Sequence, residues 1–136
     1  MNLFNREVPS LTRTDHEGHT STFAAAWKGP LVLLVNHRSR SGKEVIARAA
    51  QRAHRATIVG ERTAGAVLAG KPIKLSDGSL LYVAADDLAV DGERLEGVGV
   101  TPDVVARDDL AFAAGHDPQL DRAFEVAVAA ARGHDH

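Results

Sequence analysis

Apolar and polar positions in the middle of the chain follow two different periods. PLVLLVN at 30–36 is a continuous apolar run after Gly29, which is typical of a strand buried on both faces. The segment 42–54 carries apolar residues at helical spacing and arginines on its other side, which predicts an amphipathic helix. ATIVG at 56–60 has the pattern of a second buried strand. Together they predict a parallel strand–helix–strand unit with a right-handed crossover. The apolar stripe of the helix is expected to consist of Val45, Ile46, Ala49, Ala50 and Ala53.

Glycines and turn residues separate the remaining extended segments. The stretch GERTAGAVLAGKP, 60–72, has no clear period and is interpreted as a loop that passes close to another part of the molecule. KPIKLSDGSLLYVAA alternates around Asp77-Gly78, a strong short-range hairpin signal. Near the N-terminus, 10–29 is expected to form a hairpin that turns at 16–19. A last short strand is expected at 104–105.

The C-terminal segment has the signals of a capped helix. Asp117 is placed to cap it, Pro118 occupies its first position, and Gly133 lies just beyond its end. Its predicted apolar face consists of Leu120, Phe124, Ala127, Val128 and Ala131. The fold class is therefore α/β, with a strand–helix–strand unit, a mixed sheet and a C-terminal helix. Only two convincing helices are available to cover a sheet that needs both faces covered, which indicates a missing upstream part or a partner chain.

Composition narrows the class of protein. At 136 residues the chain is expected to form one domain, 1–136. The net charge of −2, with no dominant basic stripe, gives no case for nucleic-acid binding. The absence of cysteine excludes disulfides, thiolate metal sites and cysteine nucleophiles. No apolar stretch approaches the roughly 18 residues needed to cross a membrane, and the first residues lack a signal-peptide pattern. As written the chain is expected to be cytoplasmic, and exported if a full-length form carries a signal peptide.

No cofactor or metal site is expected. His16 and His19 lie three residues apart in a predicted turn, where no third ligand is in view.

The corner NHRSRSGKE, 36–44, admits two interpretations. Ser41 and Glu44 have the spacing of a capping box, in which the serine and the glutamate bond each other's amides. Alternatively, Ser41 is a nucleophile exposed where a strand breaks into a helix, whose N-terminal amides face developing negative charge. Helix capping and nucleophilic attack would both use the hydroxyl oxygen of Ser41. If Ser39 caps the helix instead, the Ser41 hydroxyl is available as a nucleophile.

Several separated motifs, in order, resemble one family. PLVLLVNHRSRSGKEVIARAAQRAHRATIVGERTAGAVLAG, the hairpin LSDGSLLYVA and the closing DGERLEGVGVTPDV look like the C-terminal half of a tail-specific (C-terminal processing) serine peptidase. The helix DPQLDRAFEVA is similar to the final helix of that family, so the resemblance covers about residues 28–130. It implies that 1–136 is the C-terminal portion of a larger catalytic domain.

The resemblance also implies roles for individual residues. Ser41 matches the nucleophile of the family, and the amide of Gly42 matches one oxyanion donor. Many members use a lysine base where this chain has Ala66. The sequence GERTAGAV is similar to the tricorn-core-like branch, in which an upstream histidine is the base and a downstream glutamate supports the site; Glu96 is the candidate for that glutamate. Lys43 is poorly placed as a substitute base, because it would meet the helix dipole unfavourably.

The motifs and the resemblance are compatible with two functions of different classes. The first is a serine-type peptidase that acts on peptides or protein tails and has little activity without its upstream half. The second is a non-catalytic module on the same fold that binds a peptide, an apolar ligand or a second copy of itself. A homodimer is expected if the exposed sheet is covered by another copy.

Overall fold

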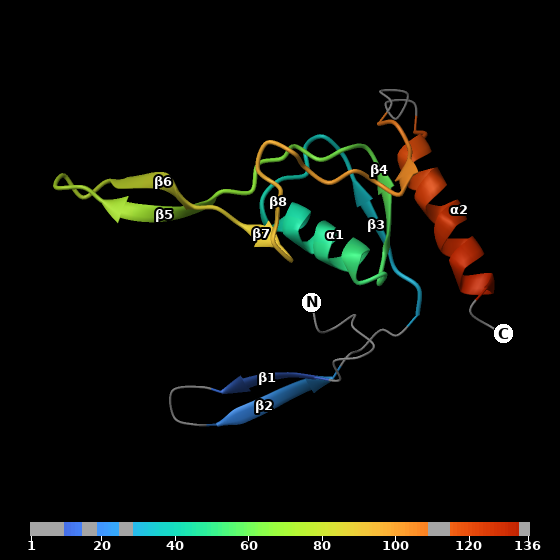
Figure 1. The fold of residues 1–136 in the computed structure, drawn as a ribbon, viewed down its shortest axis with the longest axis horizontal. Coiled ribbons are helices and arrows are strands. Elements are labelled where there is room, and N and C mark those ends of the chain that lie inside the picture. The colour runs from blue at the N-terminus through green and yellow to red at the C-terminus, as the bar shows by residue number, and fades with distance from the viewer. Residues whose placement is uncertain (1–9, 15–18, 25–28, 109–114, 134–136) are drawn as a thin grey trace.

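The computed structural model describes residues 10–14, 19–24, 29–108 and 115–133. Their elements lie in the order strand, strand, strand, helix, six strands and a final helix (Figure 1). The bounds are β1 Ser10–Thr14, β2 Thr20–Ala24, β3 Val32–Val35, α1 Gly42–Arg52, β4 Thr57–Gly60, β5 Ala69–Lys74, β6 Leu80–Asp86, β7 Ala89–Val90, β8 Glu93–Arg94, β9 Val104–Val105 and α2 Pro118–Arg132.

A three-stranded parallel sheet, β3-β4-β9, lies between the two helices (Figure 1). The α1 crossover joins β3 to β4, as the sequence predicted. The antiparallel pairs β1–β2, β5–β6 and β7–β8 form separate two-stranded sheets, so parallel and antiparallel pairing do not share a sheet. The α/β class is confirmed. The predicted hairpin near the N-terminus is also present, although its turn, 15–18, lies outside the described residues.

The core lies between α1, the parallel sheet and the segments that follow β8. Ile58, Val67 and Leu95 are fully buried there. Burial of one such side chain contributes about 1.5–3 kcal/mol. On α1 the buried residues are Glu44, Ala47 and Ala50, whereas Ile46 is 51% exposed. The predicted apolar stripe was therefore wrong at Ile46, because the helix turns a face of small residues and one carboxylate toward the sheet.

The end of β4 is tightly constrained by β3. Gly60 has φ 130°, and a Cβ at this position would lie 1.9 Å from the main-chain oxygen of Val35. The next amide, that of Glu61, donates to the same Val35 oxygen at 3.0 Å. Only glycine combines this backbone conformation with so close an approach.

α2 covers the opposite face of the sheet and has the predicted ends. Asp117 accepts a hydrogen bond from the amide of Leu120, and Pro118 occupies the first turn. The predicted apolar face, however, does not pack on the sheet: Phe124 is 62% exposed and Val128 46%. Gln119 and Ala123 are buried instead. The helix thus leaves its larger apolar side chains uncovered.

The β5–β6 hairpin projects from the body as an arm (Figure 1). It turns at Asp77-Gly78 as predicted, with Gly78 at φ 86°. Its strands are almost entirely exposed, with Leu80 at 70% and Tyr82 at 72%. The arm and the outer face of α2 are the exposed apolar areas that a larger assembly would cover.

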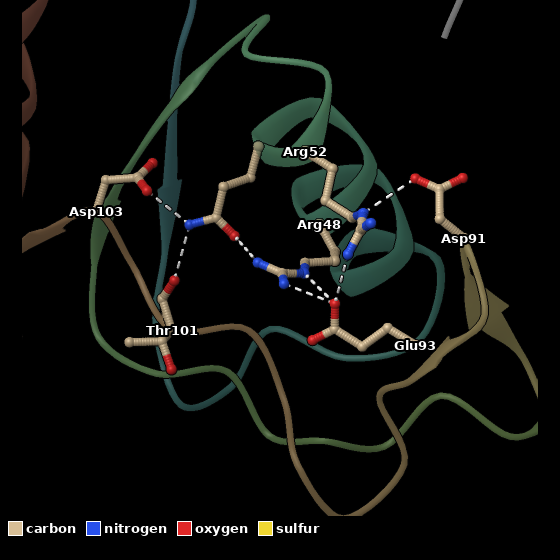
Figure 2. Close-up of polar contacts among 7 residues, drawn as sticks. Arg48, Arg52, Asp91, Glu93, Thr101 and Asp103 are labelled. Atoms are coloured by element: carbon tan, nitrogen blue, oxygen red, sulfur yellow. Dashed lines mark hydrogen bonds and ion pairs between the residues drawn. The ribbon is translucent and has the colours of Figure 1, made fainter.

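Ion pairs tie α1 to the β7–β8 hairpin (Figure 2). Arg48 donates through Nε and Nη2 to one oxygen of Glu93, at 2.9 and 2.6 Å. Arg52 donates to the same oxygen at 3.2 Å and to Asp91 at 3.0 Å. The hydrogen bond from Arg48, and after it the charges of both arginines, lower the pKa of Glu93 below its usual value. The hairpin that precedes Glu96 is thereby fixed to the helix that begins beside Ser41.

Gln51 extends this connection toward β9 (Figure 2). Its amide nitrogen donates to the carboxylate of Asp103 at 2.7 Å and to the main-chain oxygen of Thr101 at 3.0 Å. Asp103 also accepts from the amide of Ile58 at 2.8 Å. Asp103 therefore joins α1, β4 and the start of β9.

Within the described residues, no helix combines the length and apolar character that a membrane span requires.

Replacing Gly60 by alanine is expected to destabilise the fold by about 3 kcal/mol or more, because the new methyl group meets the β3 backbone and φ stays positive. Urea unfolding of G60A against wild type measures this. Gly78→Ala is the matched control, since its φ is also positive but no atom lies within 4 Å of the added Cβ. Equal stability losses in the two variants would contradict the steric argument.

Replacing Glu93 by glutamine is expected to lower the free energy of unfolding at pH 7. The folded-state pKa of Glu93 is lowered, so its stabilisation is present above the unfolded-state pKa, about 4.3, and is lost as the pH falls through the folded-state pKa. The difference between wild type and E93Q should therefore shrink on acidification, which urea unfolding across pH 3–7 measures. Glu125→Gln, on the outer face of α2, controls for loss of a surface charge. A difference that does not depend on pH would contradict this role.

Candidate active site

The corner between β3 and α1 is built by a turn that uses Ser39 internally. The amide of Asn36 donates to Ser39 Oγ at 3.2 Å, and the amide of Ser39 donates to the main-chain oxygen of Asn36 at 2.9 Å. Ser39 thus stabilises the turn after β3 and does not cap α1. The condition under which Ser41 would be freed from the cap is therefore not met, and Ser41 itself occupies the N-cap position of α1.

Ser41 is exposed and has an unusual backbone conformation. It precedes the first residue of α1 with φ 58° and ψ −133°. For a residue with a Cβ, this backbone conformation costs of the order of 1–3 kcal/mol, and it persists only where the surrounding structure fixes it. A strained strand-to-helix corner that exposes a serine hydroxyl is the geometry of a nucleophilic serine.

The capping-box spacing predicted from the sequence is present in the structure. The amide of Ser41 donates to Glu44 Oε2 at 3.2 Å, which is the glutamate half of the box. Ser41 and Glu44 have the arrangement of a capping box at the start of α1. The amide of Glu44 also donates to the main-chain oxygen of Ser41 at 2.9 Å.

Gly42 supplies the first amide of the helix. As the first residue of α1 it is one of the donors that a helix leaves without an intrahelical acceptor. The positive end of the helix dipole lies at the same place. An oxyanion formed beside Ser41 would meet this amide.

Glu96 and Ser41 contact neighbouring residues of the same loop. The amide of Ser41 donates to the main-chain oxygen of Ala66 at 2.8 Å. Glu96 Oε2 accepts from the amides of Val67 and Leu68 at 2.7 and 3.1 Å. The structure thus places the predicted glutamate one residue along the loop from the serine corner, with no hydrogen bond between their side chains.

Glycines permit this close approach of two loops. The amide of Gly97 donates to the main-chain oxygen of Gly65 at 2.8 Å. A Cβ on Gly65, at φ 68°, would lie 2.9 Å from the amide nitrogens of Val98 and Gly99. The sequence interpretation of 60–72 as a loop that passes close to another segment is correct for residues 61–68, while Ala69–Lys74 forms β5.

No described side chain acts as a base on Ser41 through a hydrogen bond. Position 66 is alanine, and Lys43 is exposed on the first turn of α1. His37, at the end of β3, is engaged elsewhere: its Nδ1 lies 3.1 Å from Glu61 Oε2. That hydrogen bond lowers the pKa of Glu61 below its usual value. The pair was not anticipated from the sequence, because only the parallel register of β3 and β4 brings the two residues together.

Glu44 was anticipated only as a capping partner. Its carboxylate is fully buried and accepts four hydrogen bonds from the serine corner and the 63–66 loop. The S-x-x-E spacing signalled its bond to Ser41, whereas the contacts from the loop depend on tertiary structure.

Among residues 10–14, 19–24, 29–108 and 115–133, no group of three or more His, Asp or Glu side chains could hold a metal ion. His16 lies outside those residues, so the expectation that residues 16–19 hold no metal ion stays a prediction.

Comparisons with known proteins point to one family. The profile of peptidase family S41 matches residues 2–106. A carboxyl-terminal-processing protease of Synechocystis is 36% identical over 95 residues, which are 69% of this chain and 22% of that protein. This chain therefore spans about a fifth of the length of that relative.

Two solved structures are similar. A photosystem II D1 C-terminal processing protease is 34% identical, with a TM-score of 0.52, over 73% of this chain and 27% of that one. The tricorn protease has a TM-score of 0.67 at 24% identity, over 89% of this chain and 12% of that one, which supports the fold alone. The motifs, the fold and these matches agree, and the chain belongs to peptidase family S41.

Proposed function

We propose that this chain is the serine-bearing, C-terminal portion of a tail-specific serine peptidase domain, with Ser41 as its nucleophile. The observation that carries the proposal is the exposed Ser41 at φ 58° and ψ −133°, at the corner between β3 and α1. Strain at a serine between a strand and a helix has a direct use in acyl transfer, because it presents the oxygen to a substrate carbonyl.

In the proposed reaction, Ser41 Oγ attacks the scissile carbonyl carbon and the carbonyl oxygen becomes an oxyanion. The Gly42 amide donates to that oxyanion. One such preorganised donor contributes about 3–4 kcal/mol to the transition state. A base takes the Ser41 proton during the attack and returns it to the amine as the C–N bond breaks. Water then hydrolyses the acyl-enzyme, which releases the new carboxylate and restores the Ser41 hydroxyl.

The base would come from the rest of the catalytic domain. A serine without a base is a weak nucleophile, and loss of the base costs several orders of magnitude in rate. Position 66, where many members of the family carry a lysine, is alanine, and the chain spans only a fraction of its relatives. We therefore expect little turnover from residues 1–136 alone.

Glu96 would support the site through the loop that follows β4. Its carboxylate holds two successive loop amides, those of Val67 and Leu68, directly after Ala66. Because the carbonyl of Ala66 binds the Ser41 amide, Glu96 would stabilise the loop against which the nucleophile rests.

The substrate class would be peptides or protein tails, because the similar proteins are carboxyl-terminal-processing proteases. The partners would be such a substrate and the upstream half of the domain.

A second candidate is a non-catalytic binding or assembly module. It is favoured by the alanine at position 66 and by the uncovered apolar side chains of the β5–β6 arm and α2, among them Tyr82 and Phe124. A homodimer through these faces would bury them.

Replacing Ser41 by alanine separates the two candidates. In the catalytic domain that contains this chain, S41A is expected to lower kcat for a tail peptide by about 10³-fold or more, with peptide affinity nearly unchanged. Peptide cleavage and fluorescence anisotropy measure the two quantities. Ser79→Ala, in the turn of the β5–β6 arm, is the matched control and should leave both unchanged.

Covalent labelling of Ser41 by a fluorophosphonate, located by mass spectrometry, tests the nucleophile directly. Wild-type turnover that survives S41A would overturn the peptidase proposal. Tight peptide binding by both wild type and S41A, with no cleavage by either, would favour the binding module.

A further inference from the structure

Glu44 is a fully buried carboxylate in the first turn of α1. An ionised carboxylate can only accept hydrogen bonds, and its burial is tolerated only when donors surround it. In the described part of the chain its partners are all uncharged: three backbone amides and one hydroxyl. The donors come from the serine corner and from the loop after β4.

One oxygen of the carboxylate joins the nucleophile corner to that loop. Glu44 Oε2 accepts from the amide of Ser41 at 3.2 Å and from the amide of Ala66 at 2.9 Å. The amide of Ser41 also donates to the main-chain oxygen of Ala66 at 2.8 Å. Ser41, Glu44 and Ala66 therefore form a closed ring of hydrogen bonds. The ring fixes the amide plane of the strained residue.

The other oxygen reaches the segment that carries Glu96. Glu44 Oε1 accepts from the amide of Gly65 at 2.7 Å and from the hydroxyl of Thr63. Thr63 in turn accepts at Oγ1 from the amide of Val100 at 2.7 Å, and its own amide donates to the oxygen of Val100 at 3.1 Å. One side chain thus connects the serine corner, the loop 63–66 and the segment 96–100.

We propose that Glu44 is the positioning residue of the nucleophile: through its two oxygens it holds Ser41 in its strained conformation and sets the place of the 96–100 segment relative to it. The proposal rests on the proposed function of Ser41. It assigns to Glu44 more than helix capping: a cap needs only the Ser41 contact, whereas three of the four donors belong to the 63–66 loop.

The substitution Glu44→Gln tests this with the smallest change in shape. The side chain of glutamine has one accepting oxygen, so either the ring through Ser41 and Ala66 or the contact with the Gly65 amide must be lost. In both cases the corner and the 63–66 loop are no longer held by the same pair of oxygens, and Ser41 should leave its strained conformation. We expect hydrogen exchange of the Ser41 and Ala66 amides, followed by NMR on the full 136-residue chain, to accelerate at least about tenfold more than that of the β4 amides.

Reactivity is the second readout. Labelling of Ser41 by a fluorophosphonate in E44Q is expected to slow by about 10–100-fold, the effect of a small misplacement of a reacting group. In the catalytic domain, kcat should fall by a similar factor while KM stays within about twofold of wild type. A residue that served stability alone would leave kcat unchanged in the molecules that remain folded.

Val59→Ala is the matched control for stability. Val59 is fully buried in β4 and pairs with Leu34 and Val104, away from the serine corner. V59A should lower the stability of the fold while leaving Ser41 labelling of the folded protein and the relative exchange of its amide unchanged. If E44Q does not fold, Glu44→Asp keeps the charge but withdraws the carboxylate by one methylene, and the same local loss of protection is expected.

The two proposals fail in different ways. If wild-type Ser41 is neither labelled nor catalytic, the peptidase proposal fails, and the exchange measurement still decides whether Glu44 fixes the corner. If E44Q and E44D keep the exchange protection of Ser41 and Ala66, or if E44Q reacts at the wild-type rate, the positioning role is refuted even with Ser41 as the nucleophile.

Discussion

A carboxylate that is buried away from water needs hydrogen-bond donors around it, and the arrangement of the segments at the centre of the molecule depends on this requirement. Glu44 brings a carboxylate into the interior, and its hydrogen-bond partners within the described residues are three amides and a hydroxyl. Those segments cannot move independently, since loss of any donor leaves part of a buried charge uncompensated. The loop after β4 and the corner before α1 thus both bind the carboxylate of Glu44. The glycines at 65 and 99 allow these segments to approach so closely, because a Cβ at either position would lie within 3 Å of the facing backbone.

The parallel sheet also positions the segments that follow β3 and β4. Parallel pairing of β3 with β4 brings the carboxyl ends of both strands to one edge, so that the serine corner and the 61–68 loop emerge side by side. Arg48 and Gln51 on α1 attach β8 and the start of β9 to the same unit. Ser41 therefore lies between a strand, a helix and two loops that are connected to one another by polar contacts.

Much of this could be predicted from the sequence, because local signals were strong. The apolar runs, the helical spacing of 42–54, the Asp77-Gly78 turn and the capped C-terminal helix gave the α/β class and most elements. The resemblance gave Ser41, Gly42 and Glu96, and all three lie around the 66–68 loop or at the start of α1. The contacts of Glu44 with Thr63 and Gly65 could not be predicted, since they depend on how distant loops approach each other. The exposure of Phe124 was missed for a similar reason: periodicity identifies an apolar face without telling what covers it.

The β5–β6 arm carries a consequence for solubility. A free two-stranded ribbon offers unpaired edges on which other strands could polymerise, and its apolar side chains would strengthen such addition. Lys71 and Lys74 on β5 place positive charges along one edge, and Lys71 is paired with Asp86 across the ribbon. Pro72, between the two lysines, removes one backbone donor from the same strand. The arm therefore combines exposed apolar side chains with residues that discourage the addition of further strands at its edge.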